Sequence, residues 1–400
     1  MADRRSPQHP RNLAFKAAIE QCRDMRIELV AERLDLELIT ASGWASGACP
    51  KCGSAGHTPG SGPVDRFNIN LSDGGFFCRK GCDDAKGSGA IDLVMVVQGV
   101  SFKEAVRYLV GDVSYTVTEA ELERQRAARK RRNDQAERNK ANRRQEAIEL
   151  ARGQWMRARG EDRAPLRDYL ALRGISRRAL RDLPVVLRYL PDYPYELRRK
   201  IDGRWRTLEL HRGPVMLAAI QGDDGKFRCL HQTWFDLSRP KGKPEILLDG
   251  VRQTNKLTRG SQRRGAIRLI TPPKFTTLVM GEGIETTLTA AIAGREIFGP
   301  DTAYWAGISL GHMHGKFARV DGKRQLGQPD LEDERAFVPP EGVRRFIFIM
   351  DADGKIEETR TKLEAGLRRA KAQCSTCQRF QIVEPAKGQD LNDMLMGATK

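Results

Sequence analysis

The sequence lacks the features that mark membrane-spanning, exported or disulfide-rich proteins. Its best apolar run, Ile91–Val97, is short, whereas a helix that crosses a bilayer needs about 18 or more apolar residues. The first residues, MADRRSPQHPRN, carry charges with no apolar segment behind them, so they are not a secretory signal. Eight cysteines in 400 residues are too few for a disulfide scaffold. These absences predict a cytoplasmic protein that does not bind membranes.

Two further absences and one excess narrow the functional class. The pattern GxxxxGK[ST] does not occur, so the chain has no P-loop motor, and we find no internal repeat. The excess is positive charge: 69 basic against 52 acidic side chains give a net charge of +17. Such a charge attracts a polyanion, and nucleic acid is the first candidate.

Hydrophobic patterning divides the chain into stretches of different character. Residues 11–35 carry apolar positions at helical spacing, and residues 91–109 do so with a break at Gly99. The segment 41–89 is dense in Gly, Ser and Pro, which predicts a small domain with little hydrophobic core. Residues 118–160 are so rich in charge that they predict a solvated helix or tether, with direct DNA contact as the alternative.

The second half of the chain predicts strands and helices. Residues 201–271 contain strand-like runs separated by turn signals such as GDDG and RPKGKP. Residues 276–400 alternate apolar strands with helical segments. This alternation is typical of a mostly parallel sheet covered by helices, so the fold class is α/β.

Four cysteines have the spacing of a metal site. Cys49 and Cys52 form one close pair, and Cys78 and Cys82 form another after a gap of 25 residues. Two such pairs can bring four thiolates to one tetrahedral Zn²⁺, and a small domain gains folding free energy from this metal. His57 as a substitute ligand, and a pair of disulfides or free structural thiols in place of a metal site, are the alternatives.

The other four cysteines give no comparable pattern. Cys374 and Cys377 stand alone after a charged helix, without a second pair or a thioredoxin-like context. We interpret this pair as incidental. Cys22 and Cys229 are most simply core residues.

Acidic residues follow three strands of the last domain. Glu282 follows the strand LVM, Asp351 and Asp353 follow the run Phe346–Met350, and Asp390 and Asp393 follow a later strand. The carboxyl ends of parallel strands share one edge of a sheet, where ligands bind. We expect these carboxylates to converge there and to hold Mg²⁺ or Mn²⁺, which prefer oxygen ligands. An acidic metal site in a basic protein suits phosphoryl transfer on nucleic acid.

Both metal patterns resemble one family. The pattern CPxC, the strand FNINL, the FFC that ends at Cys78 and the segment GAIDL after it resemble the zinc-binding domain of bacterial and phage DNA primases. This chain departs from it by one extra residue in the second cysteine pair, and by four cysteines where many relatives have a histidine. Residues 276–396, with GEGIETTL, FIMDADG and GQDLNDML, resemble the Toprim domain, whose fold is Rossmann-like.

The resemblance implies roles for the acidic residues. Glu282 would act near the reacting phosphate, and Asp351 and Asp353 would hold the metal. Asp390 and Asp393 would add to the metal site, although the last acidic pair of the family often reads DxD, which would fall on Asp390 and Asn392 and leave Asp393 one place late. The chain also has Thr286 where relatives often carry an acid four residues after the glutamate, with Glu285 beside it.

A basic subdomain precedes the Toprim-like region. The segments GDDGKFRCLHQTWFD and KPEILLDG resemble the part of primases that shapes the template and nucleotide groove. We expect phosphate contacts from the seven residues of what we call the basic set, although a solubilising loop is the alternative: Lys241, Lys243, Arg252, Lys256, Arg259, Arg263 and Arg264. His312 and His314 lie in a predicted glycine-bounded loop, where contact with phosphate or metal is the alternative to a simple loop role.

The resemblance implies a DNA primase of five parts. These are an N-terminal helix, a zinc-binding primase-type domain, a charged helical linker, a basic template- and nucleotide-binding subdomain and a Toprim catalytic domain, over residues 1–35, 36–112, 113–160, 161–275 and 276–400. Its partners would be single-stranded DNA, NTPs and a separate replicative helicase, because the chain ends soon after the Toprim region; this suits a phage- or plasmid-type primase in a bacterial cell. A Toprim nuclease or topoisomerase, and a non-catalytic single-stranded-DNA-binding relative, are the alternatives.

Overall fold

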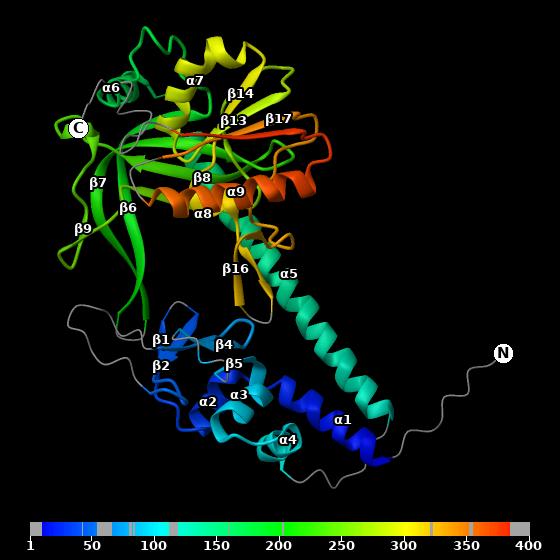
Figure 1. The fold of residues 1–400 in the computed structure, drawn as a ribbon. Coiled ribbons are helices and arrows are strands. Elements are labelled where there is room, and N and C mark those ends of the chain that lie inside the picture. The colour runs from blue at the N-terminus through cyan, green and yellow to red at the C-terminus, as the bar shows by residue number, and fades with distance from the viewer. Residues whose placement is uncertain are drawn as a thin grey trace. The chain divides into compact units, whose positions relative to one another are not determined.

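The chain divides into two compact units, Met1–Lys140 and Ala141–Lys400. The computed structural model (Figure 1) describes residues 10–41, 43–53, 66–79, 82, 85–111, 119–159, 161–201, 204–320, 323–351 and 355–384. In these residues no helix is long and apolar enough to cross a membrane.

The first unit combines a five-stranded antiparallel sheet with four short helices. The strands, in the order in which they pair, are β1 (Leu38–Ala41), β2 (Trp44–Gly47), β3 (Phe67–Asn70), β4 (Gly75–Cys78) and β5 (Lys86–Ser88). The helices are α1 (Pro10–Arg23), α2 (Ile27–Arg33), α3 (Gly89–Gln98) and α4 (Phe102–Val110). The continuous helix predicted over 11–35 is wrong, because Arg26 is extended (φ −70, ψ 125). The break at Gly99 is confirmed: this residue ends α3 in the left-handed conformation, with φ 68.

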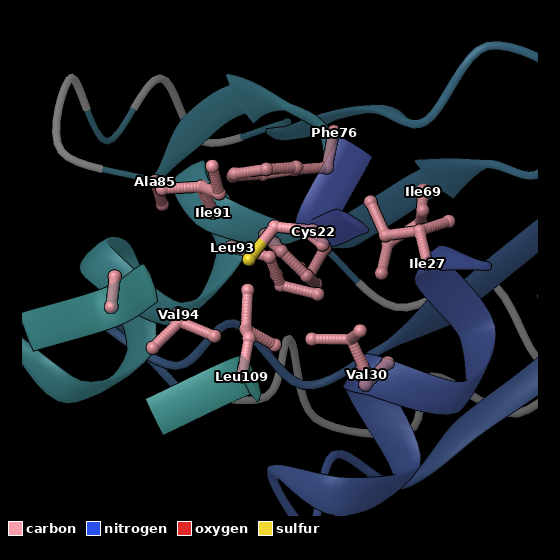
Figure 2. Packing of buried hydrophobic residues seen from close by; sticks show 14 of the residues in the cluster. Cys22, Ile27, Val30, Ile69, Phe76, Ala85, Ile91, Leu93, Val94 and Leu109 are labelled. Carbon is pink, nitrogen blue, oxygen red and sulfur yellow. The ribbon is translucent and has the colours of Figure 1, made fainter. Parts of the chain in front are cut away.

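Strands and helices share one core in the first unit. Figure 2 shows Cys22 and Val30, from α1 and α2, packed together with Ile69 and Phe76 of the sheet and Leu109 of α4. The segment 41–89 supplies few apolar residues of its own, but the helices before and after it complete the core. The cysteine-bearing strands are therefore held by a hydrophobic core in addition to any metal.

The long helix α5 (Glu119–Arg157) contributes residues to both units. In the first unit, Arg129 donates to Glu20 at 2.7 Å and Arg132 donates to Asp24 at 2.5 Å. In the second unit, Ala151 is buried against a sheet. The expectation of a solvated helix therefore describes the middle of α5 but is wrong for its C-terminal end.

The second unit begins with a four-stranded antiparallel sheet in the order β11-β8-β7-β6. One face packs against α5 through Leu217 and Trp234, and the other packs against α6 through Met216 and Tyr169. The elements of this region are α6 (Ala164–Leu172), β6 (Leu187–Ile201), β7 (Arg204–Gln221), β8 (Phe227–Trp234), a 3-10 turn (Pro240–Gly242), β9 (Leu247–Leu248), β10 (Val251–Arg252) and β11 (Lys256–Gly260).

A second sheet, in the order β12-β14-β13-β17-β18, completes this unit. Pairs β13–β14, β13–β17 and β17–β18 are parallel, and only the edge pair β12–β14 is antiparallel. The elements are β12 (Ile267–Ile270), β13 (Thr277–Gly281), α7 (Ile284–Phe298), β14 (Thr302–Ala306), α8 (Leu310–His314), β15 (Phe317–Val320), β16 (Lys323–Pro329), β17 (Arg345–Ile349), α9 (Ile356–Gln373) and β18 (Arg379–Val383).

The side chains of β13 and β17 point alternately to the two faces of the sheet, and on both faces they pack against helices. Val279 and Ile347 belong to a cluster with Ala290 of α7, whereas Leu278 and Phe346 belong to a cluster that includes residues of α9. Strands buried on both faces need continuous apolar runs, and Figure 1 shows α7 and α9 on opposite sides. The mostly parallel, helix-covered sheet predicted for this region is confirmed, while every other sheet in the described residues is antiparallel.

Candidate functional site

Four cysteine thiols meet in the first unit. The Sγ atoms of Cys49, Cys52, Cys78 and Cys82 all lie within 4.8 Å of one another, and the Cys52 and Cys78 sulfurs are 3.7 Å apart. Zn²⁺ held tetrahedrally by thiolates at about 2.3 Å places its sulfur ligands roughly 3.8 Å apart. The predicted convergence of the four thiols is confirmed, and its dimensions fit a zinc ion.

Turns in the backbone place these thiols. Cys49 and Gly53 exchange two backbone hydrogen bonds, of 2.8 and 3.1 Å, which close the turn that carries Cys52. Gly53 has φ +73, a conformation that favours glycine. Cys78 is the last residue of β4, paired with Phe67 of β3, and Cys82 follows it. The extra residue in the second cysteine pair therefore does not prevent convergence.

The close packing of the thiols separates their pKa values: hydrogen bonding with Cys52 raises the pKa of Cys82 to about 12, and burial raises the pKa of Cys49. Hydrogen bonding from the Cys82 thiol lowers the pKa of Cys52 to about 7, with a smaller contribution from Arg66, whose Nη1 is 4.0 Å from the Cys52 sulfur. A thiolate is the form that binds metal. No disulfide joins the eight cysteines, all of which are described, so the disulfide alternative is wrong in this structure.

The remaining cysteines take no part in the cluster. Cys22 and Cys229 are completely buried, so their prediction as core residues is confirmed. Cys374 and Cys377 are buried in the core of the second unit. His57, the alternative ligand, lies outside the described residues.

Two of the predicted acidic residues, Glu282 and Asp351, lie at the carboxyl ends of two paired strands. Glu282 follows β13 directly, and Asp351 follows β17 after Met350. Because β13 and β17 are parallel and in register from Thr277↔Arg345 to Met280↔Phe348, the two residues lie at the same edge of the sheet. Thr286, in the first turn of α7, donates to Asp351 at 3.2 Å.

Three of the five predicted carboxylates lie outside the described residues: Asp353, Asp390 and Asp393. The half-buried Glu282 side chain has no hydrogen bond or ion pair with any other described residue. Its carboxylate oxygens are thus free of protein partners in this part of the chain, which fits a metal-binding role.

A third carboxylate near this edge is buried and paired. Glu285, in the first turn of α7, accepts a 2.6 Å hydrogen bond from the Tyr169 hydroxyl and lies 3.4 Å from the Lys256 ammonium. Burial alone raises the pKa of Glu285, but Lys256 and then Tyr169 outweigh this effect and lower it to about 2. Glu285 is therefore a structural anion that joins α6 and β11 to α7.

Positive charge surrounds Glu285. Partial burial lowers the pKa of Lys243, and the charges of Arg173 and Lys256 lower it further. Burial, followed by the charge of Lys256, lowers the pKa of His231 to about 4, so His231 is neutral at pH 7. Three cations thus share one buried carboxylate, which leaves net positive charge beside the edge that carries Glu282.

The pairing of Glu285 predicts a loss of stability in acid. Its pKa is depressed from 4.5 to about 2 in the folded protein, a shift that contributes about 3 kcal/mol above the unfolded pKa. This contribution should be complete above about pH 5 and lost as the pH falls toward 2. We expect Glu285→Gln to remove this part of the pH dependence, measured by urea unfolding between pH 7 and pH 3.5. The exposed Glu296→Gln on the same helix is the control, and equal pH dependence in wild type and Glu285→Gln would contradict the assignment.

Members of the basic set lie in different environments. Lys256 and Lys243 lie near Glu285, as described above. Arg259 donates to the backbone oxygen of Glu196 at 2.6 Å. Lys241, in the 3-10 turn with φ 58, and Arg252 on β10 are exposed.

Arg263 and Arg264 line a cavity of about 390 Å³ in the second unit, together with Arg144 of α5 and Arg228 of β8. Arg263 pairs with Glu334, and Arg228 pairs with Asp224 at 2.7 Å. Within the described ranges, Arg144 and Arg264 have no ion-pair partner. The cavity therefore has unbalanced positive charge suited to a phosphate group.

The two histidines of the predicted loop are buried in α8. His312 Nε2 lies 2.8 Å from the backbone oxygen of Gly265, which fixes the segment that carries Arg264. The His314 ring stacks on Phe317, with centroids 5.0 Å apart. Both side chains are packed inside the protein, and the His314 Nδ1 has no hydrogen-bond partner among the described residues.

Sequence analysis missed several residues around these sites. Tyr169 and Arg144 lie on helices that carry no motif, and Arg173 caps the C-terminus of α6. The one available signal was Glu285 itself, an acid in the first turn of an otherwise uncharged stretch, next to Thr286. The identity of its partners was not accessible from the sequence, because Tyr169 is 116 residues away along the chain.

A family model described as a domain of unknown function (DUF7146) matches residues 145–269, which contain the antiparallel sheet of the second unit. No curated protein matches the chain.

Two solved structures that are similar to this chain are of primases. The crystal structure of the Aquifex aeolicus primase (zinc binding and RNA polymerase domains) aligns over 95% of this chain and 82% of its own, with 13% identity and a TM-score of 0.32. The crystal structure of the primase fragment of the bacteriophage T7 primase-helicase protein aligns over 50% of this chain and 63% of its own, with 12% identity and a TM-score of 0.27.

Proposed function

We propose that this chain is a DNA primase, which makes short RNA primers on single-stranded DNA by metal-dependent nucleotidyl transfer. The observation that carries the proposal is the position of Glu282 and Asp351 at one edge of a parallel sheet, after adjacent strands. The resemblance of this region to the Toprim domain and the four-cysteine cluster in the other unit support the same conclusion.

We call the sheet edge that carries Glu282 and Asp351 the carboxylate edge. It would supply the ligands for the catalytic metal. Glu282, Asp351 and Asp353 would bind Mg²⁺ or Mn²⁺, with Asp390 and Asp393 added from the last acidic segment. Bound metal would activate the attacking 3′-hydroxyl and stabilise charge on the α-phosphate as pyrophosphate leaves. Thr286 positions Asp351 through its hydrogen bond of 3.2 Å.

The cations beside this edge are suited to the incoming nucleotide. Lys243, Lys256 and Arg173 lie around Glu285, which offsets only one of their three charges. A nucleoside triphosphate brings several negative charges to the metal, so it would find complementary charge here. Glu285 keeps Lys256 near Glu282, because its carboxylate holds the ammonium at the start of α7.

The zinc-binding residues would serve template recognition. All four protein ligands are cysteines, which leaves no open coordination position, so the ion would be structural. The charged helical linker would connect this domain, residues 36–112, to the basic subdomain and the catalytic domain. The partners would be single-stranded DNA, NTPs and a separate replicative helicase, in the cytoplasm of a bacterial cell, with a phage or plasmid as the source of the gene.

A single assay separates this proposal from its alternatives. Labelled single-stranded DNA is incubated with the protein, NTPs and Mg²⁺ or Mn²⁺, and the products are sized on a gel. A primase makes new short RNA and leaves the template intact, whereas a Toprim nuclease shortens the template. A non-catalytic binding protein shifts the template in a native gel but makes no product.

The cavity lined by arginines predicts a specific salt dependence. DNA affinity should fall steeply between 50 and 200 mM salt, because bound cations release counterions from the phosphate backbone. We expect Arg264→Ala to reduce the slope of log K against log salt by about 0.7 to 0.9, the loss of one phosphate contact. The control is Arg360→Ala, which removes an arginine paired with Glu384 and Glu357. An unchanged slope in Arg264→Ala would remove the cavity from the DNA-binding surface.

A further inference from the structure

The hairpin of β6 and β7 extends beyond its sheet as a two-stranded ribbon. β7 pairs with β8 only from Val215 to Gln221, whereas β6 and β7 stay paired out to Ile201 and Arg204, as the long arrows in Figure 1 show. The last buried residue of β6 is Tyr195. An isolated two-stranded ribbon is at best marginally stable in water, so folding alone does not explain the extension.

The end of this ribbon concentrates positive charge. We call it the ribbon tip, and it consists of Arg198, Arg199, Ile201 and Arg204–Thr207. Arg199 and Arg206 lie directly opposite each other, an arrangement of like charges that destabilises a strand pair. Arg199 pairs with Asp249, but Arg204 and Arg206 have no carboxylate partner anywhere in the described chain. This repulsion would be relieved by an anionic ligand.

The ribbon tip also exposes a large aromatic ring. The Trp205 side chain is 59% exposed, although it lies between two arginines rather than beside a core. The guanidinium of Arg198 lies 5.7 Å from the centre of the Trp205 ring, within the range of a cation–π contact. Position 205 pairs with position 200 across the ribbon, so Trp205 shares a face with Arg198. An open ring beside Arg198, at a tip whose other face carries Arg204 and Arg206, suits a ligand that is both aromatic and anionic.

We infer that the ribbon tip is a binding site for single-stranded DNA. Trp205 would stack on an unpaired base beside Arg198, which shares its face of the ribbon. Arg204 and Arg206 lie on the opposite face, where they would attract the phosphates of the strand as it passes the tip. Stacking of this kind is tolerant of base sequence. Duplex DNA keeps its bases inside the helix, so it could use the arginines but not the ring. The inference rests on the proposed function only for the choice of DNA as the polyanion.

The test measures binding of a labelled oligo(dT) to the full-length protein by fluorescence anisotropy. Trp205→Ala should weaken binding about tenfold, the usual loss for one stacked base, whereas Trp205→Phe should retain part of the affinity. Binding to a duplex of equal length should change less than about twofold. The Arg204→Ala, Arg206→Ala double variant should weaken both ligands and lower the salt slope by roughly 1.4 on single strands.

The control for the ribbon-tip variants is Arg212→Ala. Arg212→Ala removes an arginine from the same strand, but one held by Glu209 at 2.7 and 2.8 Å and by Asp192 at 3.2 Å, so it should not alter affinity beyond the effect of one charge. Equal affinity of wild type and Trp205→Ala for oligo(dT), or an equal loss on duplex, would overturn the inference. Stronger binding of the full-length protein to anionic vesicles than to oligo(dT), lost in Trp205→Ala, would overturn the inference too.

Primer synthesis measured on the same samples separates this inference from the proposed function. If wild type makes primers but Trp205→Ala binds oligo(dT) normally, the inferred binding site at the ribbon tip is wrong and the primase proposal stands. If wild type makes no primers but Trp205→Ala loses affinity for single strands, the primase proposal fails and the ribbon tip stands.

Discussion

Asp351→Asn should reduce primer synthesis on the order of 10³-fold or more. Asp351 lies at the carboxyl end of β17, beside the strand that leads to Glu282, and would hold the catalytic metal. A metal ion contributes several kcal/mol to charge stabilisation in the transition state, and each 1.36 kcal/mol corresponds to a tenfold change in rate. Asparagine has almost the same size but lacks the charge, so folding, zinc content and DNA affinity should change little. Incorporation of labelled NTPs on single-stranded DNA measures the effect.

The matched control for this variant lies at the opposite edge of the same sheet. Asp301 immediately precedes β14 and is exposed, so Asp301→Asn makes the same chemical change at the amino end of the parallel strands. Its primer synthesis should equal that of wild type. Comparable activity of Asp351→Asn and Asp301→Asn would show that the carboxylate edge is not the site of catalysis.

Cys78→Ser should abolish zinc binding and, with it, template-dependent initiation. Cys78 places one of four converging thiols, and metal binding contributes about 10 to 16 kcal/mol in small zinc domains. This is as large as the whole stability of a typical domain, about 5 to 15 kcal/mol, so we expect strong destabilisation of the first unit in this variant, even though its hydrophobic core is unchanged apart from Cys78. Elemental analysis should find close to one zinc per chain in wild type and almost none in Cys78→Ser. Extension of a pre-annealed primer should persist, because the carboxylate edge belongs to the other unit.

Cys22→Ala tests whether the effect of Cys78→Ser arises from the metal or from the core. Cys22 is completely buried in the same core but is not part of the thiol cluster. This variant should lose some stability and keep its zinc and its initiation sites. If Cys78→Ser started primers at the same template positions as wild type, template recognition would belong to the second unit instead.

The parts of the fold that were predictable from sequence depend on local patterns. The apolar runs that become β13 and β17 are long enough to indicate strands buried on both faces, and short-spaced cysteines indicate convergence. The boundary between α1 and α2 was not predictable, because the residues Asp24–Arg26 include no Gly or Pro. The core around Phe76 was not predictable either, because the residues that pack against Phe76 come from helices on both sides of the cysteine segment in the sequence.

The candidate site was predictable only where a residue follows a strand. Glu282 and Asp351 could be placed at one edge because strand ends in a parallel sheet share that edge. By contrast, Lys256 was assigned to nucleic acid from local charge density alone, and the structure pairs it with Glu285. Trp205 was missed because its exposure depends on how far β6 and β7 extend beyond the sheet, which is a property of strand register.

The most direct test of the account is primer synthesis by the wild-type protein. Single-stranded DNA of varied sequence is incubated with labelled NTPs and Mg²⁺ or Mn²⁺, beside Asp351→Asn as the inactive reference, and the products are sized on a gel. The account predicts short RNA products in wild type that are absent with Asp351→Asn and an intact template in both. No product from wild type in either metal, or equal product from the two proteins, would contradict it.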